Sequence, residues 1–194
     1  MALGASFAAI AGHPSALVML LTALMLVLTA EMIVIAYAAW MEQVFGATVQ
    51  TLGSIAATFA VADIVGEVLS MWGVDRFGKK RALLVGFIGT TALYFVIPLL
   101  GASFLLALAA LFLYYVCFEF TVVSIFPLIS ELAPEARGTI ISLAILAENV
   151  GRMAGAVGGA WLFGAAGFGA NGIAAGLILA VTTVVFWRGV QEGG

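Results

Sequence analysis

The stretch ALVMLLTALMLVLTAEMIVIAYAAWM, residues 16–41, decides the fold class of this chain. Glu31 is its one charged residue, and its apolar residues are continuous rather than alternating with a period of two. A helix of this length rises about 39 Å, which exceeds the ~30 Å hydrocarbon core of a bilayer. The stretch therefore predicts a transmembrane helix rather than a strand.

The composition of the whole chain agrees with this interpretation. Of its 194 residues, 64% are apolar and 9% are charged, whereas a soluble domain has about 45–50% and 25%. So little polar surface means that lipid must be the main solvent. Lipid admits only helices or closed barrels, because every backbone N–H and C=O needs an internal partner. The net charge of −3 gives no reason to expect nucleic acid as a partner.

Six such apolar runs follow one another, each bounded by charged residues, proline or glycine. We therefore predict an all-α integral membrane protein, a bundle of six transmembrane helices that forms one domain over residues 1–194. The predicted spans are 16–41, 49–72, 82–100, 104–128, 138–163 and 169–187.

The basic residues predict how the bundle is oriented. Six of the seven lie in the second loop, the fourth loop or the C-terminal tail, namely Arg76, Lys79, Lys80, Arg81, Arg137 and Arg188. Cytoplasmic loops carry an excess of Lys and Arg. We therefore expect both loops and both termini in the cytoplasm, in a multi-pass protein of the cell (inner or plasma) membrane. Residues 1–15 lack the basic start of a secretory signal, so we expect no cleaved signal peptide.

Two loops carry recognisable motifs. The segment GVDRFGKKR, residues 73–81, resembles the loop signature G-x-x-x-D-R-x-G-R/K-R/K of the major facilitator superfamily, which lies between the second and third helices of each half. The segment PEARGT, residues 134–139, resembles the P-x-x-R-G element between the fourth and fifth helices of bacterial drug/proton antiporter-like members. Gly66-Glu67, Phe118-Glu119-Phe120 and Gly151-Arg152 look similar to C-terminal halves in that group.

The resemblance implies a secondary transporter that works by alternating access. Full members have twelve helices, so a six-helix chain is either a truncated half or a natural half-size protein that dimerises. With both ends on one side, two copies can pair in parallel about an axis along the membrane normal. We expect a homodimer in the lipid bilayer that exports a small organic solute coupled to protons. The alternatives are an isolated half or fragment of a twelve-helix carrier, or a non-transporting assembly or regulatory subunit.

The basic loop has two interpretations. The simpler one is that its positive charge fixes topology and meets anionic headgroups. The resemblance implies in addition a cytoplasmic gate, in which Asp75 faces a helix N-terminus and Arg76 pairs with acids. Gly78 fits a tight turn, which leaves no room for a Cβ atom. The candidate gate residues are Asp75, Arg76, Gly78, Lys79, Lys80, Glu67, Glu119 and Arg137.

Charged residues inside the spans are the strongest indications of function. A charge at the bilayer centre costs ~2.5–3.5 kcal/mol, so it usually faces protein or a water-filled cavity. Glu148 and Arg152 are four residues apart and are predicted to pair, either structurally or for transport. Asp63 is either a hydrogen-bonded packing residue or part of the pathway. The candidate substrate- or proton-binding residues are Glu31, Glu148, Arg152, Asp63, Tyr37, Tyr114 and Tyr115.

Glu31 differs from the other acids because no basic residue shares its helix. In the resembled family the first and fourth helices line the central cavity. A carboxyl group away from water accepts a proton more readily, as a proton-coupling site requires. We therefore expect Glu31 to bind a proton or a cationic substrate.

Gly151, Gly155 and Gly159 form a stripe without side chains on one face of the fifth predicted helix. Such a stripe lets another backbone approach closely. It serves either ordinary packing within the chain or, as the resemblance suggests, the contact with the second helix of the opposite half. We favour the interface.

An intramembrane enzyme is the rival from another class, since six spans also suit rhomboid-type proteases. Those enzymes need a serine nucleophile and a histidine base within the membrane. The one histidine, His13, precedes the first span. We therefore expect no enzyme activity, and the same lack argues against haem and histidine-ligated metals, so we expect no cofactor.

Overall fold

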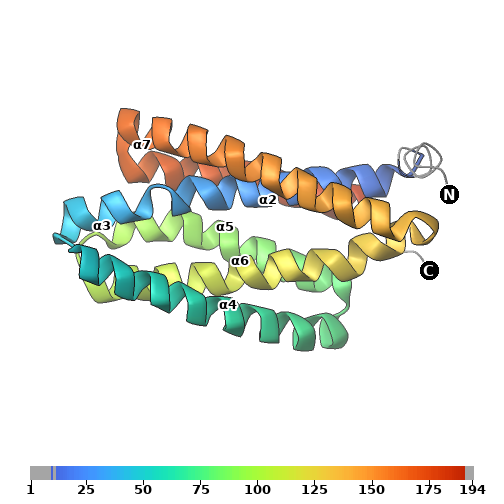
Figure 1. Cartoon of the computed structure of the whole chain (residues 1–194), viewed down its shortest axis with the longest axis horizontal. Coiled ribbons are helices and arrows are strands. Elements are labelled where there is room, and N and C mark those ends of the chain that lie inside the picture. The colour runs from blue at the N-terminus through green and yellow to red at the C-terminus, as the bar shows by residue number, and fades with distance from the viewer. Residues whose placement is uncertain (1–9, 11, 191–194) are drawn as a thin grey trace.

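The computed structural model describes residue 10 and residues 12–190, and every regular element in this part of the chain is helical. The elements follow one another as a bundle of long, roughly aligned helices (Figure 1). They are α2 (Pro14–Val34), α3 (Tyr37–Phe45), α4 (Val49–Phe77), α5 (Lys79–Val96), the 3₁₀ helix η1 (Ile97–Leu100), α6 (Phe104–Leu132), the 3₁₀ helix η2 (Pro134–Ala136) and α7 (Arg137–Gly189).

Five helical stretches in the described residues are long and apolar enough to cross a bilayer, where the sequence predicted six. They are Pro14–Phe45, Val49–Phe77, Lys79–Leu100, Phe104–Leu132 and Pro134–Gly189. The difference arises because the last two predicted spans both lie in α7, a single element of 53 residues. Gly167 inside α7 has a non-helical backbone, with φ 76° and ψ 178°. We call residues 137–166 the first segment of α7 and residues 168–189 its second segment.

The first segment of α7 packs backbone to backbone against α2. The three glycines of its stripe lie against Leu24, Leu28 and Met32 of α2, in the order Gly151, Gly155 and Gly159. A Cβ atom added to Gly155 would meet the Leu28 carbonyl oxygen and would lie 2.9 Å from the Cβ atom of Glu31. The interface with another half that we favoured for this stripe is therefore wrong, because α2 of the same chain occupies that face.

The second segment of α7 returns along α2 in the opposite direction. Asn171 lies beside Met32, whereas Gly189 lies beside Val18 and accepts a hydrogen bond from Ser15 at 3.1 Å. The chain therefore reverses at Gly167, where the positive φ favours glycine. Figure 1 shows this reversal as the orange and red stretches that meet at one end of the bundle.

The other side of the bundle is built from α4, α5 and α6. Ser70 of α4 and Ser124 of α6, both buried, hydrogen-bond to each other at 2.8 Å. Gly66 of α4 lies so close to α6 that a Cβ atom there would be 2.7 Å from that of Glu119. Small residues thus let α4 and α6 approach closely, and α5 packs against both α6 and α7.

Three polar links gather the loops and chain ends at one end of the bundle, the end that carries both terminus labels in Figure 1. They are His13–Glu135 at 3.7 Å, the Lys79–Glu131 ion pair, and a hydrogen bond from Lys80 to the Val190 carbonyl. The basic loop around Gly78 therefore lies at the same end as both termini of the described chain. This arrangement agrees with the predicted topology, while the side of the membrane stays a prediction.

We expect Gly155→Ala to lower the thermal unfolding temperature of the detergent-purified protein. The new methyl group must push the α2 backbone away, and overpacking of this kind costs about 1–3 kcal/mol. Gly158→Ala is the matched control, because a Cβ atom there has nothing within 4 Å. Intrinsic tryptophan fluorescence during heating measures both variants. Equal unfolding temperatures would contradict the backbone contact between α2 and α7.

Candidate functional site

Acidic side chains from four helices share one face of the bundle. The Glu119 carboxyl group of α6 interacts electrostatically with Asp63 and Glu67 of α4 and with Glu148 and Arg152 of α7. Tyr115, one turn before Glu119, adds an interaction with Glu31 of α2. We call this set the polar face and define it as Glu31, Asp63, Glu67, Tyr115, Glu119, Glu148 and Arg152.

Arg152 forms an ion pair with Glu31, with 3.1 Å between Nη1 and Oε2. The Glu31 side chain is 14% exposed and that of Arg152 is 57% exposed, so the pair lies at the edge of the packed helices. The sequence predicted Glu148 as the partner of Arg152, and this expectation is corrected, because Arg152 pairs with Glu31 of another helix. Gly151 and Gly155 bring α7 against α2, which places Arg152 directly beside Glu31.

Glu148 keeps a long-range electrostatic interaction with Arg152 but makes no hydrogen bond with it. Its buried Oε1 atom has no hydrogen-bond partner among the described residues, and the same holds for Oδ1 of Asp63. The polar face thus contains carboxylate oxygens without a partner in residues 12–190 or residue 10.

A row of aromatic rings borders the polar face. Tyr37 of α3 packs edge-on against Phe59 of α4 with ring centroids 5.0 Å apart. Phe59 stacks on Tyr115 of α6 with centroids 4.6 Å apart and planes within 4° of parallel. The sequence predicted Tyr37 and Tyr115 as cavity-lining residues but missed Phe59, whose signal was a large ring one turn from Asp63.

Tyr114 lies inside the bundle, behind the polar face, and not on it. Its side chain is fully buried, and its hydroxyl donates to the Ala30 carbonyl at 3.1 Å. Its ring lies 5.3 Å from that of Tyr94, which donates to Thr29 at 3.3 Å. The expectation that Tyr114 lines the cavity is therefore wrong, because it is used to hold the α2 backbone next to Glu31.

Asn171 is a second residue that the sequence analysis missed. Its fully buried side-chain amide donates to the Met32 carbonyl at 2.6 Å and to the Gly159 carbonyl at 2.9 Å. It thereby joins both segments of α7 to α2, close to the break between α2 and α3. The sequence could have indicated this role, because Asn171 is an amide in an otherwise apolar run and a polar group in lipid needs a hydrogen-bond partner.

The candidate gate residues of the basic loop lie at the turn between α4 and α5, at the loop end of the bundle. The Arg76 guanidinium lies 5.4 Å from the centre of the Trp72 ring, a cation–π contact. Lys79 forms an ion pair with Glu131. Gly78 has φ 82° at the turn between α4 and α5, a backbone angle that favours glycine. A Cβ atom there would have nothing within 4 Å, so the expected lack of room is wrong and the backbone angle is the reason for glycine.

The remaining candidates divide between the two sites. Arg137 donates from Nε to the Ser130 carbonyl at 3.3 Å and thus ties the start of α7 to the end of α6. Asp75 lines a small groove between α4 and α6. Glu67 and Glu119, expected at the gate, belong to the polar face.

Comparison with known proteins identifies the family of the chain. The family model described as Major Facilitator Superfamily matches residues 19–193. The chain belongs to the Major Facilitator Superfamily. Members of this family are membrane transporters and not enzymes, so the rhomboid-type alternative is excluded.

One relative is the uncharacterized MFS-type transporter YceJ of Bacillus subtilis (strain 168). The two are 30% identical over 120 residues, which is 60% of this chain and 30% of the relative. The chain thus covers well under half of that relative. This major facilitator chain is a multi-pass membrane protein.

We expect a double-mutant cycle of Glu31→Gln and Arg152→Gln to give a coupling of about 1 kcal/mol, because contacting charges couple and this pair is partly exposed. Unfolding in mixed SDS micelles measures the four proteins. The cycle of Glu148→Gln with Arg152→Gln is the control and should give a smaller coupling. A larger coupling energy in the Glu148 cycle than in the Glu31 cycle would indicate that Arg152 pairs with Glu148 along α7.

Proposed function

We propose that the chain is a six-crossing unit of a secondary transporter and that two copies form the complete carrier. The two segments of α7 are about 45 Å and 33 Å long at 1.5 Å per residue, so each suffices to cross a ~30 Å core. An even number of crossings brings both termini to the basic end of the bundle. The excess of Lys and Arg there supports a cytoplasmic location for that end, in the inner or plasma membrane.

The polar face is the observation that carries this proposal. It presents charged groups from α2, α4, α6 and α7, and two of its buried carboxylate oxygens lack partners in the described chain. Charged groups within a bilayer face protein or water and not lipid. A second copy, related by a two-fold axis along the membrane normal, would cover the polar face with an identical one and enclose a shared aqueous pathway.

The Glu31–Arg152 ion pair supplies a coupling mechanism within this pathway. A proton on Glu31 removes the negative charge that holds Arg152, and a cationic group on a substrate competes with Arg152 for the same carboxylate. Proton and substrate therefore exclude each other at Glu31, as antiport requires. Since the pair joins α2 to α7, either event changes the contact between these helices and shifts the balance between the inward- and outward-open states.

The aromatic row supports a small organic solute as the substrate. Tyr37, Phe59 and Tyr115 offer ring surface next to the acids of the polar face, so one site combines apolar contact with negative charge. We assign the loop end, with its Lys79–Glu131 pair, to the cytoplasmic gate. In this scheme protons enter from outside and the solute leaves the cell.

We expect Glu31→Gln to abolish substrate-driven proton flux, because an amide can neither take up a proton nor attract a cation. The protein is reconstituted into liposomes that contain a pH-sensitive dye, and lipophilic cations are screened as substrates. The decrease should be at least about tenfold, the size expected when a group essential to coupling is lost. Glu42→Gln is the control, because Glu42 is exposed on α3 and lies outside the polar face.

A Glu31→Gln protein with the wild-type rate and pH dependence would remove Glu31 from the mechanism. A wild-type protein that moves no protons with any of these solutes would contradict proton-coupled export itself.

We expect disulfide cross-links between differently tagged copies in membranes when one copy carries Ala60→Cys and the other Val157→Cys. Both positions are exposed, on α4 and on the first segment of α7, the helices that flank the polar face. Both copies carry Cys117→Ser so that the native thiol does not interfere. Val181→Cys, exposed on the second segment of α7, is the control and should not cross-link.

Absence of any cross-link, together with a monomeric mass in mild detergent, would contradict the homodimer. That outcome would favour one half of a longer carrier, a reading that the greater length of the YceJ relative supports, or an assembly subunit.

A further inference from the structure

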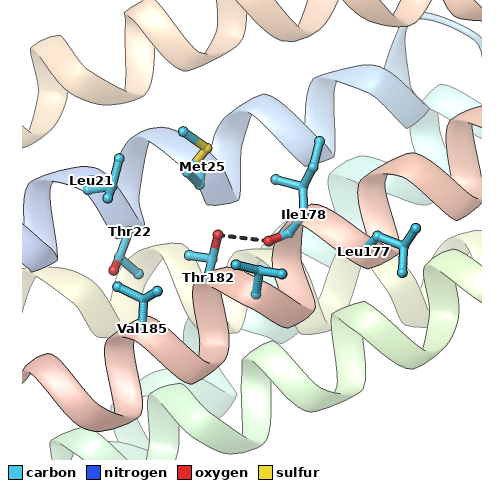
Figure 2. Close-up of a pocket in the computed structure, with 8 residues that line it drawn as sticks. Leu21, Thr22, Met25, Leu177, Ile178, Thr182 and Val185 are labelled. Atoms are coloured by element: carbon cyan, nitrogen blue, oxygen red, sulfur yellow. Dashed lines mark hydrogen bonds between the residues drawn. The ribbon is translucent and has the colours of Figure 1, made fainter.

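An apolar groove runs between α2 and the second segment of α7 (Figure 2), with a volume of about 380 Å³. Its lining residues are Leu21, Thr22, Met25, Leu177, Ile178, Val181, Thr182 and Val185. None of them belongs to the polar face. The groove is therefore separate from the proposed transport site.

The two threonines in the groove use their hydroxyl hydrogens within their own helices and offer no free donor. Thr22 donates its hydroxyl to the Val18 carbonyl at 2.7 Å, and Thr182 donates to the Ile178 carbonyl at 2.8 Å, the bond drawn in Figure 2. Their methyl groups remain for contact, beside aliphatic walls. Leu177 is 57% exposed and Val181 is 65% exposed, so the walls are available from outside. The lining therefore favours an apolar occupant such as a hydrocarbon chain.

The groove points toward a positive charge. Leu177, Val181, Val185 and Arg188 fall on one face of the helix, since they are separated by four, four and three residues. From Leu177 to Arg188 the helix rises about 16 Å, close to the ~15 Å thickness of one leaflet of the hydrocarbon core. Arg188 is exposed at the loop end of the bundle, where Lys80 reaches the Val190 carbonyl and adds positive charge.

We propose that this groove binds an anionic glycerophospholipid, with an acyl chain along Leu177–Val185 and the phosphate at Arg188. The planar guanidinium suits a phosphate oxygen pair, and a single leaflet supplies both the chain and the headgroup in the required order. The second segment of α7 and α2 would thereby be joined by a lipid on their outer surface. The site is independent of the transported solute.

Native mass spectrometry of the full chain, released from micelles with equal amounts of phosphatidylglycerol and phosphatidylcholine, tests this site. We expect wild-type protein to retain phosphatidylglycerol in preference by about fivefold, the effect of one basic side chain near an anionic surface. Arg188→Gln should abolish the preference and Arg188→Lys should keep most of it. Arg81→Gln is the matched control, because Arg81 is exposed on α5 and does not line the groove.

Val181→Trp tests the apolar part of the site, because the indole fills a groove that is open at that position. We expect this variant to retain less of both lipids. The proposal would be overturned if Arg188→Gln kept the preference for phosphatidylglycerol or if Arg81→Gln lost it equally. It would also be overturned if Val181→Trp retained both lipids in full or if the wild type retained no lipid.

Discussion

Where α7 crosses α2, three glycines remove the side chains that would hold the two helices apart. Inside a bilayer no water is released when helices associate, so van der Waals contact and interhelical hydrogen bonds must hold them together. Gly155 lies against the Leu28 backbone, and Asn171 closes the same contact at its far end with hydrogen bonds to Met32 and Gly159. The positions of the ion pair and the polar face follow from this contact.

The ion pair shows why the contact matters for function. Glu31 and Arg152 are each costly alone in lipid, about 2.5–3.5 kcal/mol at the bilayer centre. At the edge of the packed helices each is the charge partner of the other, while Arg152 remains largely exposed. In the proposed mechanism, a proton or a cation replaces Arg152 at Glu31. Tyr114 holds the Ala30 carbonyl behind it, so the Glu31 backbone is fixed while its side chain can respond.

The bundle presents different surfaces to different neighbours. The polar face, with the aromatic row beside it, needs protein or water and supports pairing with a second unit. The groove along the second segment of α7 is apolar up to Arg188 and suits lipid. The loop end carries the basic residues and the links between chain ends. The three surfaces thus differ in chemistry: one is charged and aromatic, one is apolar, and one is basic.

The sequence by itself determined the membrane environment, the helical class, the turn at Gly78 and the family motif in the basic loop. These depend on hydropathy and local backbone geometry, which neighbouring residues decide. It did not determine the partner of Arg152, the neighbour of the glycine stripe, the buried position of Tyr114 or the role of Asn171. Arg152 and Glu31 are 121 residues apart in the chain. Only the packing of α7 on α2 brings them together, because periodicity identifies a helix face but not the helix that covers it.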